Sequence, residues 1–230
     1  MSSECARCGD SEPSHRLLGL DLCHCCYQRL HSDFSKTKVT GIKKVEKGTQ
    51  QILEGLRDTF GLDISDANFT GTPKRVARAY YEMCLGINCS EDIDAIVNTA
   101  FPSTYGGMVI SKGISCYSLC PHHLLPVIYS VDVGYIPKDK AIGLSKIPRI
   151  VKLLSKAPKL QEQFTQDIAD VLQRIECQGG IVQVRGKHQC MDARGVEQPQ
   201  VVTMTSSIFG NFENLEVRNE FQLLIQNNTM

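Results

Sequence analysis

The sequence predicts an α+β protein in which an antiparallel four-stranded sheet carries a helix pair on one face. Hydrophobic residues recur at helical spacing from about residue 40, and beyond about residue 105 they begin to alternate as in strands. The element order strand–strand–helix–helix–strand–strand (ββααββ) then describes a two-layer fold. Five of the eleven cysteines fall within residues 5–26, which marks a separate head. We expect a cysteine-rich head over 1–38 and a catalytic domain over 39–230, with helices in 39–104.

The head has the cysteine spacing of a structural zinc site. Cys5-x2-Cys8 and Cys23-x2-Cys26 are two close pairs separated by a loop, which is typical of a zinc ribbon. A segment this short cannot build a sufficient core without its metal. We therefore expect one zinc ion on Cys5, Cys8, Cys23 and Cys26. Reduced cysteines in a disordered tail are the alternative.

Two helices follow the head. A hydrophobic stripe on a charged background predicts a helix from about residue 40 that ends at Gly61. Thr72-Pro73 predicts the start of the second helix, with Thr72 as its N-cap and proline in the first turn.

The remaining elements form the ββααββ unit over 105–230. Alternation from Val127 to Tyr135 predicts a strand with one buried face, and residues 108–115 are its expected antiparallel neighbour. The spacing of hydrophobic residues, and the glycines that interrupt it, predict the other elements. These are helices over 146–156 and 160–176, and strands near 180–188 and 200–208. The second face of this sheet is exposed unless another subunit covers it.

Composition and charge exclude several classes of protein. The 25 basic and 25 acidic residues of the 230-residue chain cancel, so no global field attracts nucleic acid or a membrane. No apolar run approaches the length of about 18 residues that a membrane-spanning helix needs. The N-terminus does not read as a signal peptide. We expect a cytoplasmic, reducing location, where cysteines serve as metal ligands and buried thiols.

Two short segments concentrate the reactive side chains. Cys120 and His123 are three residues apart, and Cys190 offers a third ligand. Two cysteines and one histidine leave a zinc ion one open coordination position, which is a catalytic pattern. His122 and His188 remain as acid and base candidates. Buried thiols and hydrogen-bonded core histidines are the alternative interpretation.

A second group of residues is basic. Gly143-Leu144-Ser145-Lys146 lies at a strand-to-helix junction, with Arg149 one helical turn later. Amides at a helix N-terminus, a hydroxyl and a lysine form a suitable anion site. If these residues and Arg75 and Arg194 converge near the metal, they indicate a polyphosphate group on the substrate.

These residues resemble the motifs of the GTP cyclohydrolase I family over about residues 40–226. The motifs, in chain order, are Thr72-Pro73-x-Arg75-Val76-Ala77, Ser118-x-Cys120-x-His122-His123-x-x-Pro126, Tyr135-Ile136-Pro137, Gly143-Leu144-Ser145-Lys146-x-x-Arg149, Gln161-Glu162, His188-x-Cys190-Met191-x-x-Arg194-Gly195-Val196 and Arg218-x-Glu220-Phe221. The cysteine-rich head lies outside the resemblance.

The resemblance implies a zinc-dependent enzyme that opens the imidazole ring of GTP, releases formate and forms 7,8-dihydroneopterin triphosphate. Its expected zinc ligands are Cys120, His123 and Cys190. It implies that His122 protonates the ring nitrogen, that His188 serves in ribose opening and that Glu162 anchors the guanine edge. The triphosphate contacts it implies are Arg75, Ser145, Lys146, Arg149 and Arg194. It also implies the tunnelling fold, assembled as a homo-oligomer, typically a decamer, with sites between subunits.

The chain differs from the common residues of the family at a few positions. Pro121 stands where the family commonly has glutamate, Glu197-Gln198 replace basic residues, and Phe209 replaces a common arginine. Pro121 is the feature that favours an alternative function, a catalytically inactive pterin- or nucleotide-binding regulator on the same fold. A nucleobase deaminase is a further alternative, but the site segments have no His-x-Glu motif.

Overall fold

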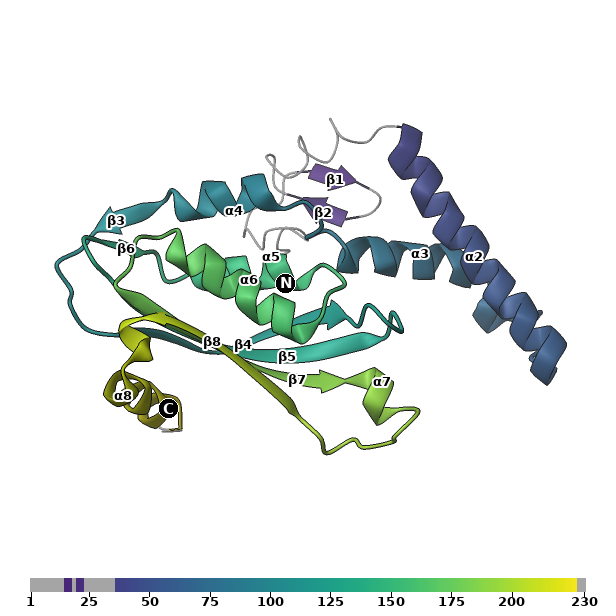
Figure 1. Ribbon diagram of the computed structural model, residues 1–230. Coiled ribbons are helices and arrows are strands. Elements are labelled where there is room, and N and C mark those ends of the chain that lie inside the picture. Colours follow the sequence, from purple (N-terminus) through teal and green to yellow (C-terminus); the bar gives the residue numbers. More distant parts are fainter. Residues whose placement is uncertain (1–14, 18–19, 23–35, 227–230) are drawn as a thin grey trace. The chain divides into compact units, whose positions relative to one another are not determined.

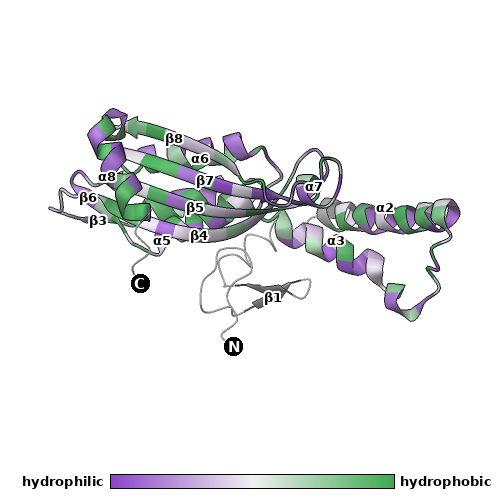
Figure 2. Cartoon of the chain, turned by 90° about the horizontal axis from the view of Figure 1, so that it is seen from below, coloured by the Kyte–Doolittle hydropathy of each residue, from purple (hydrophilic) through white to green (hydrophobic). Residues whose placement is uncertain are grey.

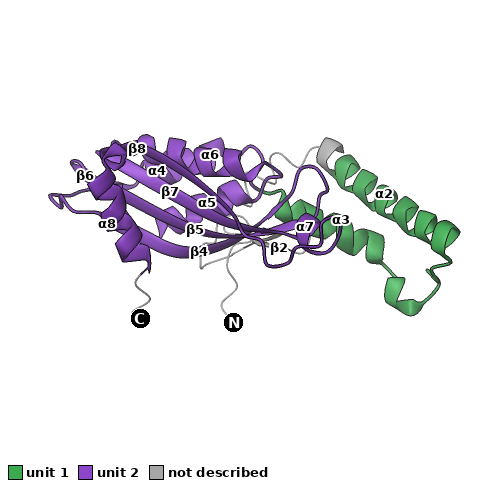
Figure 3. Cartoon of the chain, turned by 60° about the horizontal axis from the view of Figure 1, so that its bottom comes forward, with its two compact units in different colours: residues 1–85 green, residues 86–230 purple. Residues whose placement is uncertain are grey.

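The computed structural model describes residues 15–17, 20–22 and 36–226. The chain divides into two compact units, residues 1–85 and 86–230 (Figure 3). The four cysteines expected to hold a zinc ion in the head lie outside the described residues. No helix in the described part of the chain has the length and apolar character needed to cross a membrane.

The first unit contains a short antiparallel strand pair and two packed helices. Strand β1 (His15–Leu17) pairs with β2 (Leu20–Leu22), and helix α2 (Lys36–Phe60) packs on α3 (Thr72–Met83). A 3-10 turn, η1 (Ala67–Phe69), precedes α3. Leu53 of α2 and Ala77 of α3 are buried.

The structure confirms both predicted helices and corrects one cap. Helix α2 ends at Phe60, directly before Gly61, whose φ of 72° is a conformation that glycine adopts without strain. Helix α3 begins at Thr72, so the predicted N-cap is already the first helical residue. Gly71, with a φ of 74°, is the N-cap instead, and no side chain caps the helix.

The second unit is built on one four-stranded antiparallel sheet (Figure 1). Its strand order is β4 (Val109–Leu119), β5 (Pro126–Ile136), β7 (Gly179–His188) and β8 (Thr203–Gly210). Helices α5 (Lys146–Ser155) and α6 (Gln161–Gln173) cover one face. The predicted ββααββ unit is therefore confirmed.

The core lies between this sheet and its helix pair. Alternate residues of β5 point into it, and each is at most 1% exposed: Val127, Tyr129, Val131, Val133 and Tyr135. Ile147 and Ile150 of α5 and Phe164 and Ile168 of α6 meet them from the helix side. Burial of apolar area on this scale is the main stabilising contribution to the unit.

The other sheet face is only partly covered. Helix α8 (Leu215–Gln226) places Phe221 against Gly134 and Ile181 at one end of that face. Hydrophobic and hydrophilic segments alternate along β5 and β7 when the sheet is viewed from below (Figure 2). Tyr117 and Met204 remain 62% exposed, since both point away from the α5 and α6 layer.

An ion pair with a buried carboxylate fixes the middle of this second face. Asp132 of β5 is fully buried, pairs with Arg185 of β7 and accepts a hydrogen bond of 2.7 Å from the Gly113 amide. Gly113, with a φ of 70°, lies in the bulge of β4. The carboxylate therefore holds together three neighbouring strands.

Several elements were not anticipated from the sequence. They are α4 (Ser90–Val97), the pair β3 (Ala100–Pro102) and β6 (Lys140–Ile142), the one-turn helix α7 (Gln189–Asp192), η2 (Asn211–Glu213) and α8. All except α8 are short segments, in which few residues are available to reveal a period.

Candidate active site

A tight turn between β4 and β5 brings two of the expected zinc ligands together. The Leu124 amide donates to the Cys120 carbonyl at 2.8 Å, and the Cys120 amide donates to the Leu125 carbonyl at 2.9 Å. His123 Nδ1 then lies 3.7 Å from Cys120 Sγ. Pro121, which lacks an amide donor, is accommodated in this turn without separating the two ligands.

The third ligand arrives from the end of β7. In the register of the sheet, His188 is opposite Val127, so the last residue of β7 meets the start of β5. Helix α7 follows immediately and presents Cys190. The ligand atoms of Cys120, His123 and Cys190 all lie within 4.8 Å of one another. We call these three residues the metal cluster.

The metal cluster fits zinc in both chemistry and spacing. Two thiolates and one imidazole are the donors that zinc prefers. At zinc bond lengths, ligand atoms that share one tetrahedral ion lie about 3.5–4 Å apart. The observed spacing therefore needs only small side-chain adjustments to close around one ion.

Arg194 lies directly against the metal cluster. Its Nη1 is 2.9 Å from Nε2 of His123. A guanidinium can only donate, so this contact uses the lone pair of His123 Nε2; a metal ion bound at Nδ1 would leave the proton on Nε2 and require Arg194 to move away.

The two histidines outside the cluster differ in their surroundings. His122 is exposed, and its Nδ1 lies 3.8 Å from Cys120 Sγ. His188 is half-buried, and its Nε2 lies 2.9 Å from Oε1 of Gln161. Burial lowers the pKa of His188, and the negative charges of Glu162 and Asp192 oppose that shift.

Gln161 determines which nitrogen of His188 carries a proton. Its Nε2 donates to the carbonyls of Val184 and Thr203, at 3.2 and 2.9 Å, and to Thr205 Oγ1 at 3.1 Å. The amide group therefore presents Oε1, an acceptor, to the imidazole. His188 Nε2 must donate, so Nδ1 of the neutral ring is the nitrogen left for proton transfer.

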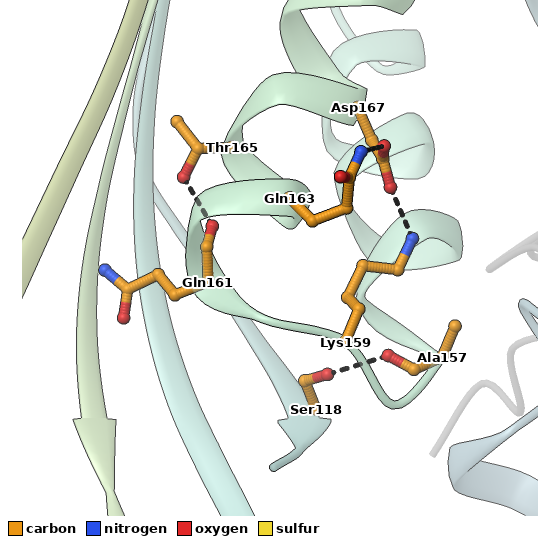
Figure 4. A network of polar contacts seen from close by, with 7 residues as sticks. All are labelled: Ser118, Ala157, Lys159, Gln161, Gln163, Thr165 and Asp167. Carbon is orange, nitrogen blue, oxygen red and sulfur yellow. Dashed lines mark hydrogen bonds and ion pairs between the residues drawn. The ribbon is translucent and has the colours of Figure 1, made fainter. Parts of the chain in front are cut away.

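A polar network holds the start of α6 in place (Figure 4). Ser118 Oγ donates to the Ala157 carbonyl at 3.1 Å, and Thr165 Oγ1 donates to the Gln161 carbonyl at 2.8 Å. Lys159 Nζ lies 2.6 Å from Asp167 Oδ2. These contacts fix the segment that carries Gln161 and its exposed neighbour Glu162. The sequence analysis assigned no role to Gln161. Its position next to Glu162 is the feature that could have pointed to one.

The expected phosphate contacts on α5 lie far from the metal cluster. Ser145 directly precedes α5, Lys146 begins it, and Arg149 follows one turn later. The Tyr135 hydroxyl, near the end of β5, contacts Ile142 just before this segment, whereas the cluster adjoins the start of β5. Helix α5, about 15 Å long for its ten residues, runs from Lys146 back toward Ser118. We call Ser145, Lys146 and Arg149 the basic end.

Arg75 belongs to the first unit and is engaged there. Its guanidinium donates to the carbonyls of Thr70 and Asn68, at 2.7 and 3.1 Å, and to Thr72 Oγ1 at 2.7 Å. Within that unit it ties η1 to the start of α3.

The sequence comparisons with known proteins agree on one family. The family model for GTP cyclohydrolase I matches residues 45–226. The chain belongs to the GTP cyclohydrolase I family. It is 39% identical over 180 residues to the GTP cyclohydrolase 1 of Finegoldia magna, covering 77% of this chain and 95% of that protein. It is 41% identical over 179 residues to that of Methylococcus capsulatus, covering 76% and 96%.

A solved structure also resembles part of the chain. The crystal structure of the archaeosine synthase QueF-Like in the apo form matches 47% of this chain and 97% of that chain, with a TM-score of 0.37 and 16% identity. The family assignment rests on the sequence matches rather than on this one.

Proposed function

We propose that the chain catalyses the hydrolytic opening of GTP, with loss of formate and formation of 7,8-dihydroneopterin triphosphate. GTP cyclohydrolase activity is supported by family membership across residues 45–226 and by the curated relatives. The observation that carries the proposal is the metal cluster, with ligand atoms within 4.8 Å of one another, beside a histidine oriented by Gln161.

The three cluster residues are the proposed ligands of one catalytic zinc ion, and the family is zinc-dependent in general. When bound, zinc supplies Lewis acidity at the reacting carbon. Cys120 and Cys190 come from segments 70 residues apart in sequence, so the folded sheet must form before the site can hold its metal.

Two histidines are the proposed proton-transfer groups. His122 is exposed beside the cluster and is assigned to protonate the nitrogen of the imidazole ring as it opens. His188 presents Nδ1 as a base, because Nε2 donates to Gln161, and it is assigned to acid–base chemistry at the ribose. A lowered pKa keeps more of His188 neutral near pH 7 and therefore ready to accept a proton.

Glu162 is the proposed anchor of the guanine edge. It is exposed at the first turn of α6, next to the residue that holds His188. A carboxylate accepts hydrogen bonds from two adjacent N–H groups, which is the pattern of the guanine edge.

The triphosphate is assigned to Ser145, Lys146, Arg149, Arg194 and Arg75. Within the second unit, Arg194 contacts the metal cluster, whereas the basic end is separated from it by the length of α5. We therefore propose that each site combines the metal cluster of one subunit with the basic end of a neighbour. The family is oligomeric, and a decamer whose subunits join their sheets into a barrel is the assembly we propose.

The remaining assignments concern the head and the cellular location. A second, structural zinc ion on Cys5, Cys8, Cys23 and Cys26 is proposed from their spacing alone. A cytoplasmic location is proposed because the described residues contain no disulfide, which fits a reducing compartment.

One preparation tests these assignments together. Purified protein should convert GTP to a product that becomes a fluorescent pterin after oxidation, with one formate released and two zinc ions per chain. Replacing Cys5 and Cys8 with serine should remove one zinc ion. Full zinc content without turnover of GTP would contradict the proposed activity, and one zinc ion in both forms would contradict the site in the head.

Mixing two impaired variants tests the composite site. Cys190→Ser and Lys146→Ala each damage a different half of it, so subunit exchange between them should raise the activity above the average of the two separate variants. If the mixture is no more active than that average, both halves of each site come from one chain.

A further inference from the structure

A closed ring of hydrogen bonds holds the Gln161 side chain where it contacts His188. Gln161 Nε2 donates to Thr205 Oγ1 at 3.1 Å, and Thr205 Oγ1 lies 2.6 Å from Thr165 Oγ1. Thr165 Oγ1 in turn donates to the Gln161 carbonyl at 2.8 Å, a bond drawn in Figure 4 with the Gln161 side chain extending toward the strands. The ring therefore starts at the end of the Gln161 side chain and returns to the main chain of the same residue.

The protons of this ring can point in one direction only. A carbonyl oxygen only accepts, so the single proton of the Thr165 hydroxyl is used on the Gln161 carbonyl. The contact between the two hydroxyls then requires Thr205 to donate to Thr165. With its own proton used, Thr205 Oγ1 meets the Gln161 amide as an acceptor, which matches the N–H group that faces it.

Thr205 reaches the ring from a distant part of the chain. It lies on β8 opposite Val184 of β7, and it is partly buried, whereas its neighbour Met204 points away from the helices and is exposed. Thr165 of α6 is 2% exposed. Water therefore competes little for the bond between the two hydroxyls, which joins β8 to α6.

The Gln161 amide reaches His188 across Gly186 of β7. A Cβ at position 186 would lie 2.1 Å from Gln161 Oε1 and 2.9 Å from Gln161 Cδ. Beyond that point, Oε1 lies 2.9 Å from His188 Nε2. A glutamine side chain has several rotatable bonds, and fixing it in one conformation costs entropy. The ring offsets that cost at the end of the side chain that contacts His188.

Two backbone carbonyls share this task with Thr205. Those of Val184 and Thr203 accept from the same amide nitrogen at 3.2 and 2.9 Å. They keep the NH2 group on their side, whatever side chains surround it. Removing the Thr205 hydroxyl should therefore loosen the amide rather than turn it over.

We infer that Thr205 is a positioning residue that acts on His188 through Gln161, with Thr165 fixing the direction of its hydroxyl. This rests on the proposed function, in which His188 serves in acid–base chemistry at the ribose. An imidazole whose partner is fixed stays aligned for proton transfer, whereas one whose partner moves is aligned for less of the time.

Thr205→Val replaces the hydroxyl with a methyl group of similar size, and Ser207→Ala is its matched control. Ser207 lies two residues further along β8, and its Oγ donates to Gln166 Oε1 of α6 at 3.0 Å. We expect T205V to lower kcat about three- to tenfold, the effect of one hydrogen bond, with little change in KM for GTP. S207A should leave both values unchanged. An equal loss of kcat in both variants, or failure of T205V to fold, would make the hydroxyl structural and overturn the inference.

Two further variants test the route through Gln161. Thr205→Ser keeps the hydroxyl and should return kcat to near the parent value. In a Gln161→Ala background, T205V should cause no additional loss, because the residue through which it acts is gone. An additional loss as large as that in the parent background would overturn the inference.

Crystal structures of the parent and of T205V decide the inference without any turnover. Gln161 should hold one rotamer in the parent, with Oε1 within hydrogen-bond distance of His188 Nε2, and more than one rotamer in T205V. A Gln161 side chain that stays unchanged in T205V would overturn the inference. If the parent does not turn over GTP, the proposed function fails, and this comparison still decides whether Thr205 positions Gln161.

Discussion

The two ends of the sheet in the second unit differ in how firmly the fold orients their functional side chains. At the metal cluster, ligands and histidines are oriented by a turn, by a strand register and by Gln161. At the basic end, no hydrogen bond or ion pair engages the side chains of Lys146 and Arg149 among the residues that the structure covers. One end is preorganised by the chain itself, whereas the other presents cations whose counter-charge must come from elsewhere.

The difference indicates which interactions each end requires. A metal ligand must be held within a few tenths of an ångström, which demands support from the fold. A phosphate group tolerates long, flexible cations, since the attraction varies slowly with distance. Four predictions follow from this contrast, in order of decreasing effect.

Removing a ligand should have the largest effect. Cys190→Ser is expected to lose the catalytic zinc and to reduce GTP turnover to background, because two ligands cannot hold the ion. Cys177→Ser is the matched control, since Cys177 is half-buried and bonds to the Leu172 carbonyl outside the cluster. Metal analysis and turnover on the same samples decide the result; a Cys190 variant with full zinc content would exclude Cys190 as a ligand.

Disturbing the orientation of His188 should have the next largest effect. Gly186→Ala places a Cβ 2.1 Å from Gln161 Oε1, so the amide must move. We expect kcat to fall roughly 100-fold, the usual contribution of a positioned acid–base group, with zinc content retained. Gly55→Ala, which meets nothing within 4 Å, should leave kcat unchanged. A normal kcat in the Gly186 variant would mean that the contact between His188 and Gln161 does not contribute to catalysis.

Removing one cation of the basic end should have a smaller effect, mainly on binding. Lys146→Ala and Arg149→Ala are each expected to lower kcat/KM for GTP about 10- to 100-fold, the loss of one charge-assisted hydrogen bond of about 1.5–3 kcal/mol. The melting temperature should barely change, because neither side chain has a partner to lose among the described residues. Steady-state kinetics and thermal melting measure the two effects, and a large loss of stability would show that the cations support the fold.

The smallest effect concerns a cysteine near the cluster that is not a ligand. Burial raises the pKa of Cys116 to about 11, and the hydrogen bond with Ser155 opposes this only in part. At pH 8 about one thiol in a thousand is ionised, so Cys116 should resist alkylation in native protein, and its rate should rise with pH up to about 11. Mass spectrometry after iodoacetamide treatment measures the rate; rapid labelling at pH 7 would show that the thiol is accessible.

The sequence was most informative where a pattern is local. Alternation along Val127–Tyr135 predicted β5, and the helical repeats predicted α5 and α6, because each period reports which side of one element is buried. The N-cap of α3 was placed one residue late, since a glycine with positive φ can enter a helix as readily as a threonine. Helix α8 was missed because only Phe221 of its twelve residues is buried.

For the site, the sequence supplied the residue types, and the tertiary structure supplied their distances from one another and their burial. The spacing of Cys120 and His123, and the resemblance that extends it to Cys190, already defined a candidate metal cluster. The role of Gln161 and the separation of the basic end depend on strand register and helix direction. These place residues that are far apart in sequence next to each other. Residue chemistry is a local property of the chain, whereas distance and burial depend on how all its elements pack together.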